Sequence, residues 1–534
     1  MDKKTILAVI LSVLVVIGYQ VYTAKFYPAA LETGTTQAPV NEMYPLPGEK
    51  RGAGAVAISI ASEEIAAREL PEKIIIKETE KYIVELSSVG GCIKDIKLKN
   101  GGYSSSDKGS DLIAIQKPEN TIFNMEGLGF GGLSKTGFKV EEKGNEIIFS
   151  SKLAGGLELV KKYIFYNSLY NMDLEVYIKN NSSAQVRASY TINTAADIGV
   201  DSKMDKRYIQ AVAEIDGKTK RNSGAKGKGL FQEGSIGYAG LQNRYFSVIA
   251  KSNIPTDGLL VKRLDDGNIS SAISVSEFAI LPQSVLSHKF VLYAGPTSKE
   301  IMSEYGIESA ASFGFLGGIS NVLLAALRLF HKVFRNWGVA VILLSVLVNL
   351  ILFPLSRKSY ESMKKMQTVQ PHMDKLREEH KDNPQKLNKE IMELYKKHQV
   401  NPMGGCLPLI LQMPVFIALY QTLMKSLELR GARFLWIKDL SMPDAVLLPF
   451  NLPLIGGSIN ILPILMAGAM VFQQKFSTAK GAGQSQQQKQ QQQMMIIMPV
   501  IFLFIMYNFP SGLVLYWLVN TLLTMFEQRA IMHS

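Results

Sequence analysis

The chain has 534 residues, 47% of them hydrophobic, and a formal net charge of +12 at pH 7. This length exceeds one ordinary soluble domain, and the apolar residues gather in separate blocks, which excludes a single globular unit and predicts soluble and membrane-embedded parts. The positive charge is typical of proteins that meet nucleic acid or anionic lipid.

The chain opens with Lys3 and Lys4, followed by an apolar run over residues 6–22. A signal peptide and an uncleaved membrane anchor are both open interpretations. The run is longer than a typical signal-peptide core and no small-x-small cleavage site follows it, which favours the anchor. The two lysines place the N-terminus in the cytoplasm. We expect an anchor at 1–24 and a linker rich in Pro, Thr, Gly and Ala at 25–70.

Short β-rich stretches separated by turn residues recur between residues 71 and 296. This pattern predicts a large antiparallel β-sandwich, which the preceding anchor places outside the cytoplasm, and with a short helix over 298–312 the domain spans 71–312. We expect the Gly- and Lys-rich segment 217–229 to be a surface loop.

The predicted sandwich has few features of an enzyme. Its one histidine, His288, stands without metal-ligand spacing or a nucleophile motif, although carboxylates distant in sequence can still pair in space. The chain's two cysteines, Cys92 and Cys406, fall in the soluble and membrane-embedded parts, so they form neither a disulfide framework nor a metal cluster. We predict a binding or scaffolding module with no cofactor and no metal.

Residues 319–334 carry apolar side chains at helical spacing opposite basic ones such as Arg328 and Lys332. The pattern predicts an amphipathic helix in the membrane interface over 313–335. A helix packed on the soluble domain is the alternative.

Five apolar segments of membrane length follow. With the anchor, they predict a polytopic α-helical membrane protein with six transmembrane helices and both termini in the cytoplasm. The expected order is a span at 336–355, a cytoplasmic helical hairpin at 356–402, a span at 403–426, a periplasmic loop at 427–451, a span at 452–473, a Gln-rich cytoplasmic loop at 474–493, spans at 494–509 and 512–527, and a cytoplasmic tail at 528–534. The last two apolar runs, 494–509 and 513–526, are shorter than the roughly 20 residues that a bilayer needs, which predicts local thinning of the membrane.

The expected hairpin carries eleven Lys and Arg residues, which supports its cytoplasmic placement. Two helical patterns flank Asp382, Asn383 and Pro384 within it. A solvated hairpin and a hairpin that contacts ribosomal RNA or lipid headgroups are both open interpretations. The candidate contact residues are Lys364, Lys365, Lys375 and Arg377. No nucleic-acid fold signature is present, so we expect no recognition of a specific nucleic-acid sequence.

Three amides, Asn349, Gln412 and Asn520, lie on three different expected spans. The helical rise places each of them about 10–12 Å above the cytoplasmic end of its span, which predicts one shared level. Polar side chains at such depth usually face a bundle interior or a wet cavity. Hydrogen bonds that only join helices are the alternative. Ser345, one turn deeper, and Thr524, one turn shallower, extend the same polar wall.

Several motifs of the membrane part resemble those of a known family. They lie at residues 401–408, 412–416, 427–430, 498–500 and 509–516. They are similar to the YidC family of bacterial membrane protein insertases, in its Gram-negative form with a large periplasmic domain. The resemblance implies a five-helix insertase core in the inner membrane, a hydrophilic groove open to cytoplasm and lipid, and a periplasmic β-supersandwich. It implies nascent membrane proteins and the lipid bilayer as partners, with the Sec translocon and the ribosome as further candidates.

The chain departs from the family pattern at two positions. Asn349 stands where the family's groove usually carries an arginine, and Trp517 stands where the family often has a second tyrosine after Tyr516. We therefore expect hydration of the groove by Asn349, Gln412 and Asn520, rather than a fixed charge, to ease the passage of a polar segment. Trp517 is expected to contact the apolar part of the substrate.

Two other functions remain open from the residues. A small-solute transporter or channel predicts a closed pore through both leaflets. A membrane-anchored periplasmic chaperone predicts that removal of residues 71–296 abolishes function.

Overall fold

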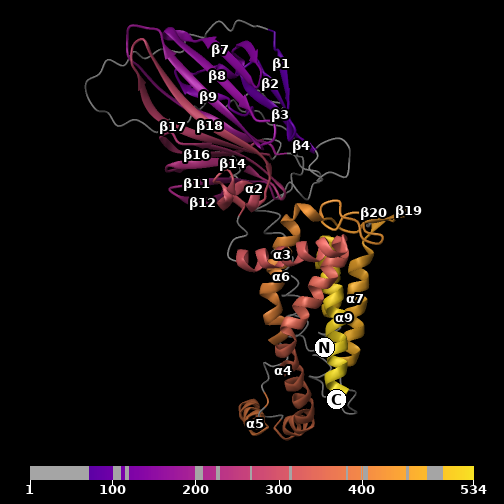
Figure 1. The fold of residues 1–534 in the computed structure, drawn as a ribbon. Helices are drawn as coiled ribbons and strands as arrows, with labels where there is room; N and C mark the ends of the chain where they lie inside the picture. The colour runs from indigo at the N-terminus through magenta and orange to yellow at the C-terminus, as the bar shows by residue number, and fades with distance from the viewer. Residues whose placement is uncertain are drawn as a thin grey trace.

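The computed structural model describes residues 71–99, 110–114, 120–198, 208–223, 229–264, 268–311, 316–380, 383–398, 400, 407–452, 456–477 and 497–533. The expected anchor at 1–24, the linker at 25–70 and most of the Gln-rich loop at 474–493 lie outside these residues, as does Cys406. The described residues form a β-domain followed by a helical bundle (Figure 1).

The β-domain confirms the predicted antiparallel sandwich and is built from three sheets. The four-stranded sheet has the order β1 (Ile74–Glu78), β2 (Tyr82–Ser87), β3 (Cys92–Leu98), β4 (Ser110–Ala114). The five-stranded sheet has the order β13 (Leu230–Glu233), β16 (Thr256–Arg263), β17 (Ile269–Ile280), β10 (Val186–Ala196), β5 (Met125–Leu128). The nine-stranded sheet has the order β12 (Lys218–Asn222), β11 (Gln210–Ile215), β14 (Ile236–Gln242), β15 (Phe246–Ser252), β18 (Ser284–Pro296), β9 (Asn171–Asn180), β8 (Leu157–Phe165), β7 (Glu146–Lys152), β6 (Lys139–Lys143). Two short 3-10 turns, η2 (Leu133–Lys135) and η3 (Ala154–Gly156), interrupt the strands.

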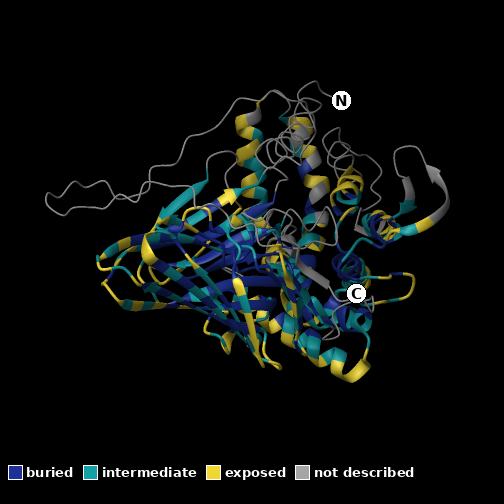
Figure 2. Cartoon of the chain, turned by 90° about the horizontal axis from the view of Figure 1, so that it is seen from above, coloured by how far each residue is buried: buried dark blue, intermediate teal, exposed yellow. Residues whose placement is uncertain are grey.

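The core of the domain lies between the nine-stranded sheet and the two smaller ones, where the buried residues in Figure 2 gather. Strand β8 shows how the sequence specifies this, because buried and half-buried residues alternate along it. Its inward face includes one charged residue, Lys161, with no exposed surface. The ammonium donates hydrogen bonds to the carbonyl oxygens of Gly90 at 2.8 Å and Phe123 at 2.7 Å. These bonds satisfy a group that would otherwise be costly to bury.

The prediction of a surface loop over 217–229 is wrong for its first part. Residues 218–222 form strand β12, which pairs with β11. Asp216 and Gly217 join the two strands, with φ of 51° and 71°. An Asp-Gly pair in this conformation is a strong signal for a β-hairpin. The prediction of a loop relied instead on the Gly and Lys content of the segment.

The helical part begins under the β-domain and ends far from it (Figure 1). Its elements are α2 (Lys299–Ser303), η5 (Glu308–Ala311), α3 (Gly317–Phe334), α4 (Trp337–Glu379), α5 (Pro384–Lys397), α6 (Leu407–Lys425), η8 (Leu427–Leu429), the strands β19 (Val446–Leu452) and β20 (Gly456–Ile459), α7 (Ile461–Ser477), a helix over Ile497–Met506, and α9 (Ser511–His533). Helix α3 lies across the end of the bundle nearest the β-domain, and the α4–α5 hairpin occupies the opposite end.

One helical stretch among the described residues, Trp337–Met366, is long and apolar enough to cross a membrane. Two shorter apolar stretches, Ile461–Gln474 and Ile497–Met506, accompany it. The first stretch belongs to α4, whose 43 residues join the span expected at 336–355 and the first helix of the hairpin without a break.

Two boundaries in the bundle differ from the sequence expectation. The segment expected to span from residue 452 begins as the β19–β20 hairpin, and α7 starts only at Ile461. A short apolar run can form a strand or a helix, and periodicity alone does not tell the two apart. The pair Gly456-Gly457, which opens β20, was the sign in the sequence against a continuous helix. Helix α9 has 23 residues, about 34 Å, because it continues beyond the expected end at 527 to His533, while its apolar run still ends at Phe526, so membrane thinning stays a prediction.

Candidate functional site

The candidate site is a row of polar side chains along one face of α9. Tyr516, Asn520 and Thr524 follow each other at intervals of four residues, so they stack on one side of the helix. Each of them accepts a hydrogen bond from an amide on a different neighbouring helix. We call the six residues the polar ladder.

The first rung joins α6 to α9, because Gln412 Nε2 donates to Tyr516 Oη. In the second, Asn349 Nδ2 of α4 donates to Asn520 Oδ1 over 3.1 Å. The third joins α7 to α9, and here Gln473 Nε2 donates to Thr524 Oγ1, also over 3.1 Å. Three helices therefore meet α9 through neutral hydrogen bonds.

Burial differs along the ladder. Tyr516 is fully buried and Asn349 is 7% exposed, whereas Gln412, Asn520 and Gln473 are half-buried. Every rung thus has at least one half-buried member. An amide carries both donors and acceptors, so these groups can exchange partners with water or with another polar chain.

The prediction that the three amides share one level is wrong in detail. Asn349 and Asn520 meet directly, but Gln412 bonds one turn away at Tyr516. From Tyr516 to Thr524 the ladder extends about 12 Å along α9. The amides therefore form a sequence of steps along the helix axis.

The structure sets Ser345 and Trp517 apart from the ladder. Ser345 is fully buried, and its hydroxyl donates to the carbonyl of Val341 in its own helix at 2.8 Å. Trp517 is 9% exposed, and its ring packs on Phe416 and Phe502 with centroid distances of 4.9 and 5.1 Å. Trp517 thus packs within the bundle, and its contact with a substrate stays a prediction.

Two members of the ladder, Tyr516 and Gln473, were missed by sequence reasoning. Tyr516 ends the motif at residues 509–516, and its four-residue spacing from Asn520, repeated to Thr524, was the signal that could have placed it in the ladder. Gln473 closes an apolar segment and showed no such pattern.

No charged side chain belongs to the ladder. Arg357, two turns beyond Asn349 on α4, pairs with Glu361 at 2.9 Å. The position at which the resemblance implies an arginine therefore holds a neutral pair, Asn349 with Asn520.

The hairpin keeps its expected basic residues on the surface. Lys364, Lys365 and Lys375 are exposed on α4, and the side chain of Arg377 lies outside the described residues. A small apolar core joins α4 to α5 and to Val400, three residues beyond α5: Val369, Met373 and Val400 are flanked by Met366, Ile391, Leu394 and Tyr395.

Comparisons with known proteins cover almost the whole chain. Residues 75–326 match the model of the family described as YidC periplasmic domain, and residues 329–534 match that of the 60Kd inner membrane protein. The membrane protein insertase YidC of Geobacter metallireducens is 31% identical over 100% of this chain and 99% of its own length. The insertase of the same name from Geobacter sulfurreducens is also 31% identical, with the same coverage. The crystal structure of an active YidC insertase with its first transmembrane domain resolved is 20% identical, covers 85% of this chain and 92% of that one, and has a TM-score of 0.37.

Proposed function

Because the chain belongs to the YidC family of membrane protein insertases, we propose that it inserts nascent proteins into the bacterial inner membrane and helps them fold there. The activity rearranges non-covalent contacts and needs no reacting group. The comparisons favour neither the transporter nor the chaperone alternative.

We further propose that the β-domain lies in the periplasm and the α4–α5 hairpin in the cytoplasm. In this topology the anchor at 1–24, α4, α6, α7, the helix over Ile497–Met506 and α9 are the six spans. The hairpin and the last residues of α9 lie at the same end of the bundle, far from the β-domain, which supports a cytoplasmic C-terminus (Figure 1).

The polar ladder is proposed as the path for the polar flank of a substrate. A segment that crosses hydrocarbon leaves its polar groups unsatisfied, at a cost of several kcal/mol each. The half-buried amides Gln412, Asn520 and Gln473 can replace the lost water contacts in a groove of the cytoplasmic leaflet. The hydrophobicity of the substrate then supplies the free energy when its apolar part enters the lipid.

The observation that carries this proposal is that every rung joins two neutral side chains, at least one of which is half-buried. A hydrogen bond between membrane helices contributes only about 0.6 kcal/mol on average. A nascent chain can therefore displace one without a large penalty. The ribosome is a proposed partner at the exposed lysines of the hairpin, and the Sec translocon is a proposed partner of the whole insertase.

A double substitution separates this role from simple helix joining. Asn349→Leu with Asn520→Leu removes both members of a rung, so no amide is left unsatisfied and stability stays near that of the wild type. We expect insertion of a small single-span substrate into vesicles to fall at least about tenfold, because the path loses one polar step of over 1 kcal/mol.

The matched control is Thr422→Val, which removes a buried polar side chain of α6 outside the ladder. Insertion by this variant should stay within about twofold of the wild type. If the double variant inserts as well as the control does, the rung only joins helices and the ladder is not the path.

A further inference from the structure

A second polar site lies at the opposite end of the bundle, where the β-domain meets α3 and α6. A cavity of about 110 Å³ opens there. Its charged and amide lining comes from four elements: Lys299 and Glu300 of α2, Asn321 and Arg328 of α3, Lys425 of α6, and Glu428 of η8. The volume admits several waters or one group of the size of a phosphate.

Each of the two carboxylates of the cavity has two partners among the lining residues. Glu300 binds Arg328 at 3.0 Å with one oxygen and the Ser298 hydroxyl at 2.6 Å with the other. Glu428 binds Arg328 at 2.7 Å and the Ser426 hydroxyl at 2.7 Å in the same way. The Ser298 hydroxyl, and after it Arg328, lower the pKa of Glu300 to about 2. Arg328 and both carboxylates therefore form one closed network.

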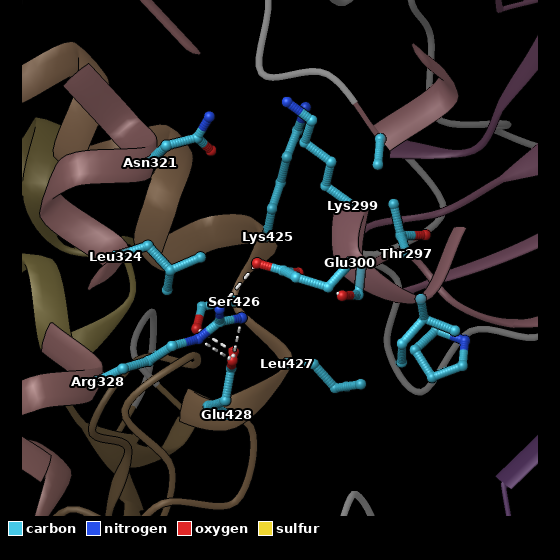
Figure 3. Close-up of a pocket in the computed structure, with 14 residues that line it drawn as sticks. Thr297, Lys299, Glu300, Asn321, Leu324, Arg328, Lys425, Ser426, Leu427 and Glu428 are labelled. Carbon is cyan, nitrogen blue, oxygen red and sulfur yellow. Dashed lines mark hydrogen bonds and ion pairs between the residues drawn. The ribbon is translucent and has the colours of Figure 1, made fainter. Parts of the chain in front are cut away.

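The other two cations of the lining are the ammonium groups of Lys299, which is an exposed residue, and Lys425. Figure 3 shows both lysine side chains extending away from Arg328 and Glu428, and Asn321 of α3 also lines the cavity. Three cations against two carboxylates leave the lining with a net positive charge. A cavity of this kind selects an anion that accepts several hydrogen bonds.

Helix α3 indicates where such an anion would come from. Its outer side exposes Val322, Leu329 and Val333 at 68%, 60% and 66%, a stripe suited to acyl chains. The same helix turns Asn321 and Arg328 to the cavity. A helix that rests in the interface with this stripe in the lipid holds the cavity at the depth of the lipid phosphates.

We propose that this cavity binds the phosphate group of an anionic phospholipid from the outer leaflet, with Lys299 and Lys425 as the charged contacts. A lipid held there would join the β-domain, α3 and α6 at one point. The lipid source rests on the proposed membrane topology, whereas the preference for a phosphate rests on the cavity alone.

The test is native mass spectrometry of the full-length protein released from detergent micelles that contain phosphatidylglycerol or phosphatidylcholine. The variant is Lys299→Gln with Lys425→Gln, and the control is Lys152→Gln with Lys262→Gln, two exposed lysines of the β-domain that do not line the cavity. A third variant, Lys299→Arg with Lys425→Arg, keeps the charge and guards against a loss of fold.

We expect the wild type, the control and the arginine variant to retain phosphatidylglycerol in preference to phosphatidylcholine. The glutamine variant should retain at least about fivefold less phosphatidylglycerol, since each lysine near lipid phosphates contributes on the order of 1 kcal/mol. Equal retention by the glutamine variant and the control overturns the proposal, as does retention of the two lipids to the same extent.

Competition with inorganic phosphate distinguishes a phospholipid headgroup from free phosphate as the ligand of the cavity. If millimolar phosphate fails to displace phosphatidylglycerol, the ligand is the lipid. If phosphate displaces the lipid and binds in a lysine-dependent way by itself, the phosphate site stands and the lipid source is overturned. Neither readout involves insertion, so the outcome is independent of the proposed function.

Discussion

At the scale of single residues, the chain replaces an expected charge with a neutral pair. The Asn349 amide donates to Asn520 where the resemblance implies an arginine. A guanidinium would hold an acidic segment by Coulomb attraction, whereas two amides offer hydrogen bonds to a polar segment of either sign. For this chain, the neutral ladder makes hydration, not charge, the basis of the proposed path.

A different residue-scale feature, Lys161 in the β-domain, gives a prediction about pH. Burial lowers the pKa of its ammonium below the unfolded value of about 10.4. Between the two values the unfolded chain binds more protons, so the free energy of unfolding rises with pH. Lys161→Met removes this contribution. We expect the free energy of unfolding of the wild type to rise relative to that of the variant as the pH rises from neutral toward about 10. The measurement is urea unfolding of the full chain followed by circular dichroism.

Its neighbour Lys162 is a control of opposite sign. The Glu146 carboxylate raises the pKa of this half-buried lysine, so the stability that it contributes is present at neutral pH and is lost as the pH rises through the folded pKa. Because that loss begins only above the unfolded value of about 10.4, the difference in the free energy of unfolding between the wild type and Lys162→Met should stay nearly constant over the same range. Parallel curves for the wild type and Lys161→Met would show that burial does not perturb the Lys161 ammonium.

At the scale of elements, the sequence predicted the kind of most segments but not all of their ends. Alternation along strands such as β8 and the helical spacing of α3 were sufficient signals. The start of α7 could not be predicted, because it is capped from outside the segment. Asp444 Oδ2 accepts the backbone N–H groups of Ile461 and Leu462, both at 2.9 Å, across the β19–β20 hairpin. The ladder was predictable only in part, since Gln473 joins it through the crossing of α7 and α9.

The cap leads to a prediction for α7. Asp444→Ala removes the acceptor for two N–H groups at the helix start and one for the Trp436 indole. We expect the free energy of unfolding in detergent to fall by about 1–2 kcal/mol, the usual range for a lost N-cap. Asp444→Asn, which keeps an oxygen acceptor, should recover most of it.

The control for this cap is Glu142→Ala. It breaks only the exposed pair with Lys73, which contributes about 0–1 kcal/mol. Equal stability of Asp444→Ala and this control would mean that the helix start is held by other contacts.

At the scale of the whole molecule, one arginine links the β-domain to the membrane part. Arg244, 3% exposed, donates to the carbonyl oxygens of Met424 at 3.0 Å and Ser441 at 3.2 Å. Its guanidinium also lies 4.8 Å from the centre of the Tyr245 ring. Bonds from a charged donor in a buried site are strong, so the two parts are held together at the end of α6.

Loss of this link should loosen the junction without unfolding either part. We expect Arg244→Met to increase hydrogen exchange in the segment from Met424 to Ser441 at least tenfold, because each bond from a charged group contributes about 1.5–3 kcal/mol. Arg187→Met, which breaks an exposed pair with Glu277, should leave that segment unchanged. If hydrogen exchange in this segment is unchanged in Arg244→Met, contacts other than those of Arg244 hold the two parts together.

Site-specific photo-crosslinking can show whether a nascent chain passes along the polar ladder. A photoreactive residue is placed at 349, at 520, or at Leu465, a 46% exposed apolar position of α7, in inner-membrane vesicles that hold a stalled single-span membrane protein. If the ladder is the path, we expect adducts with the nascent chain from 349 and 520 but not from 465. Adducts from 465 alone, or efficient insertion with none from 349 and 520, would contradict it.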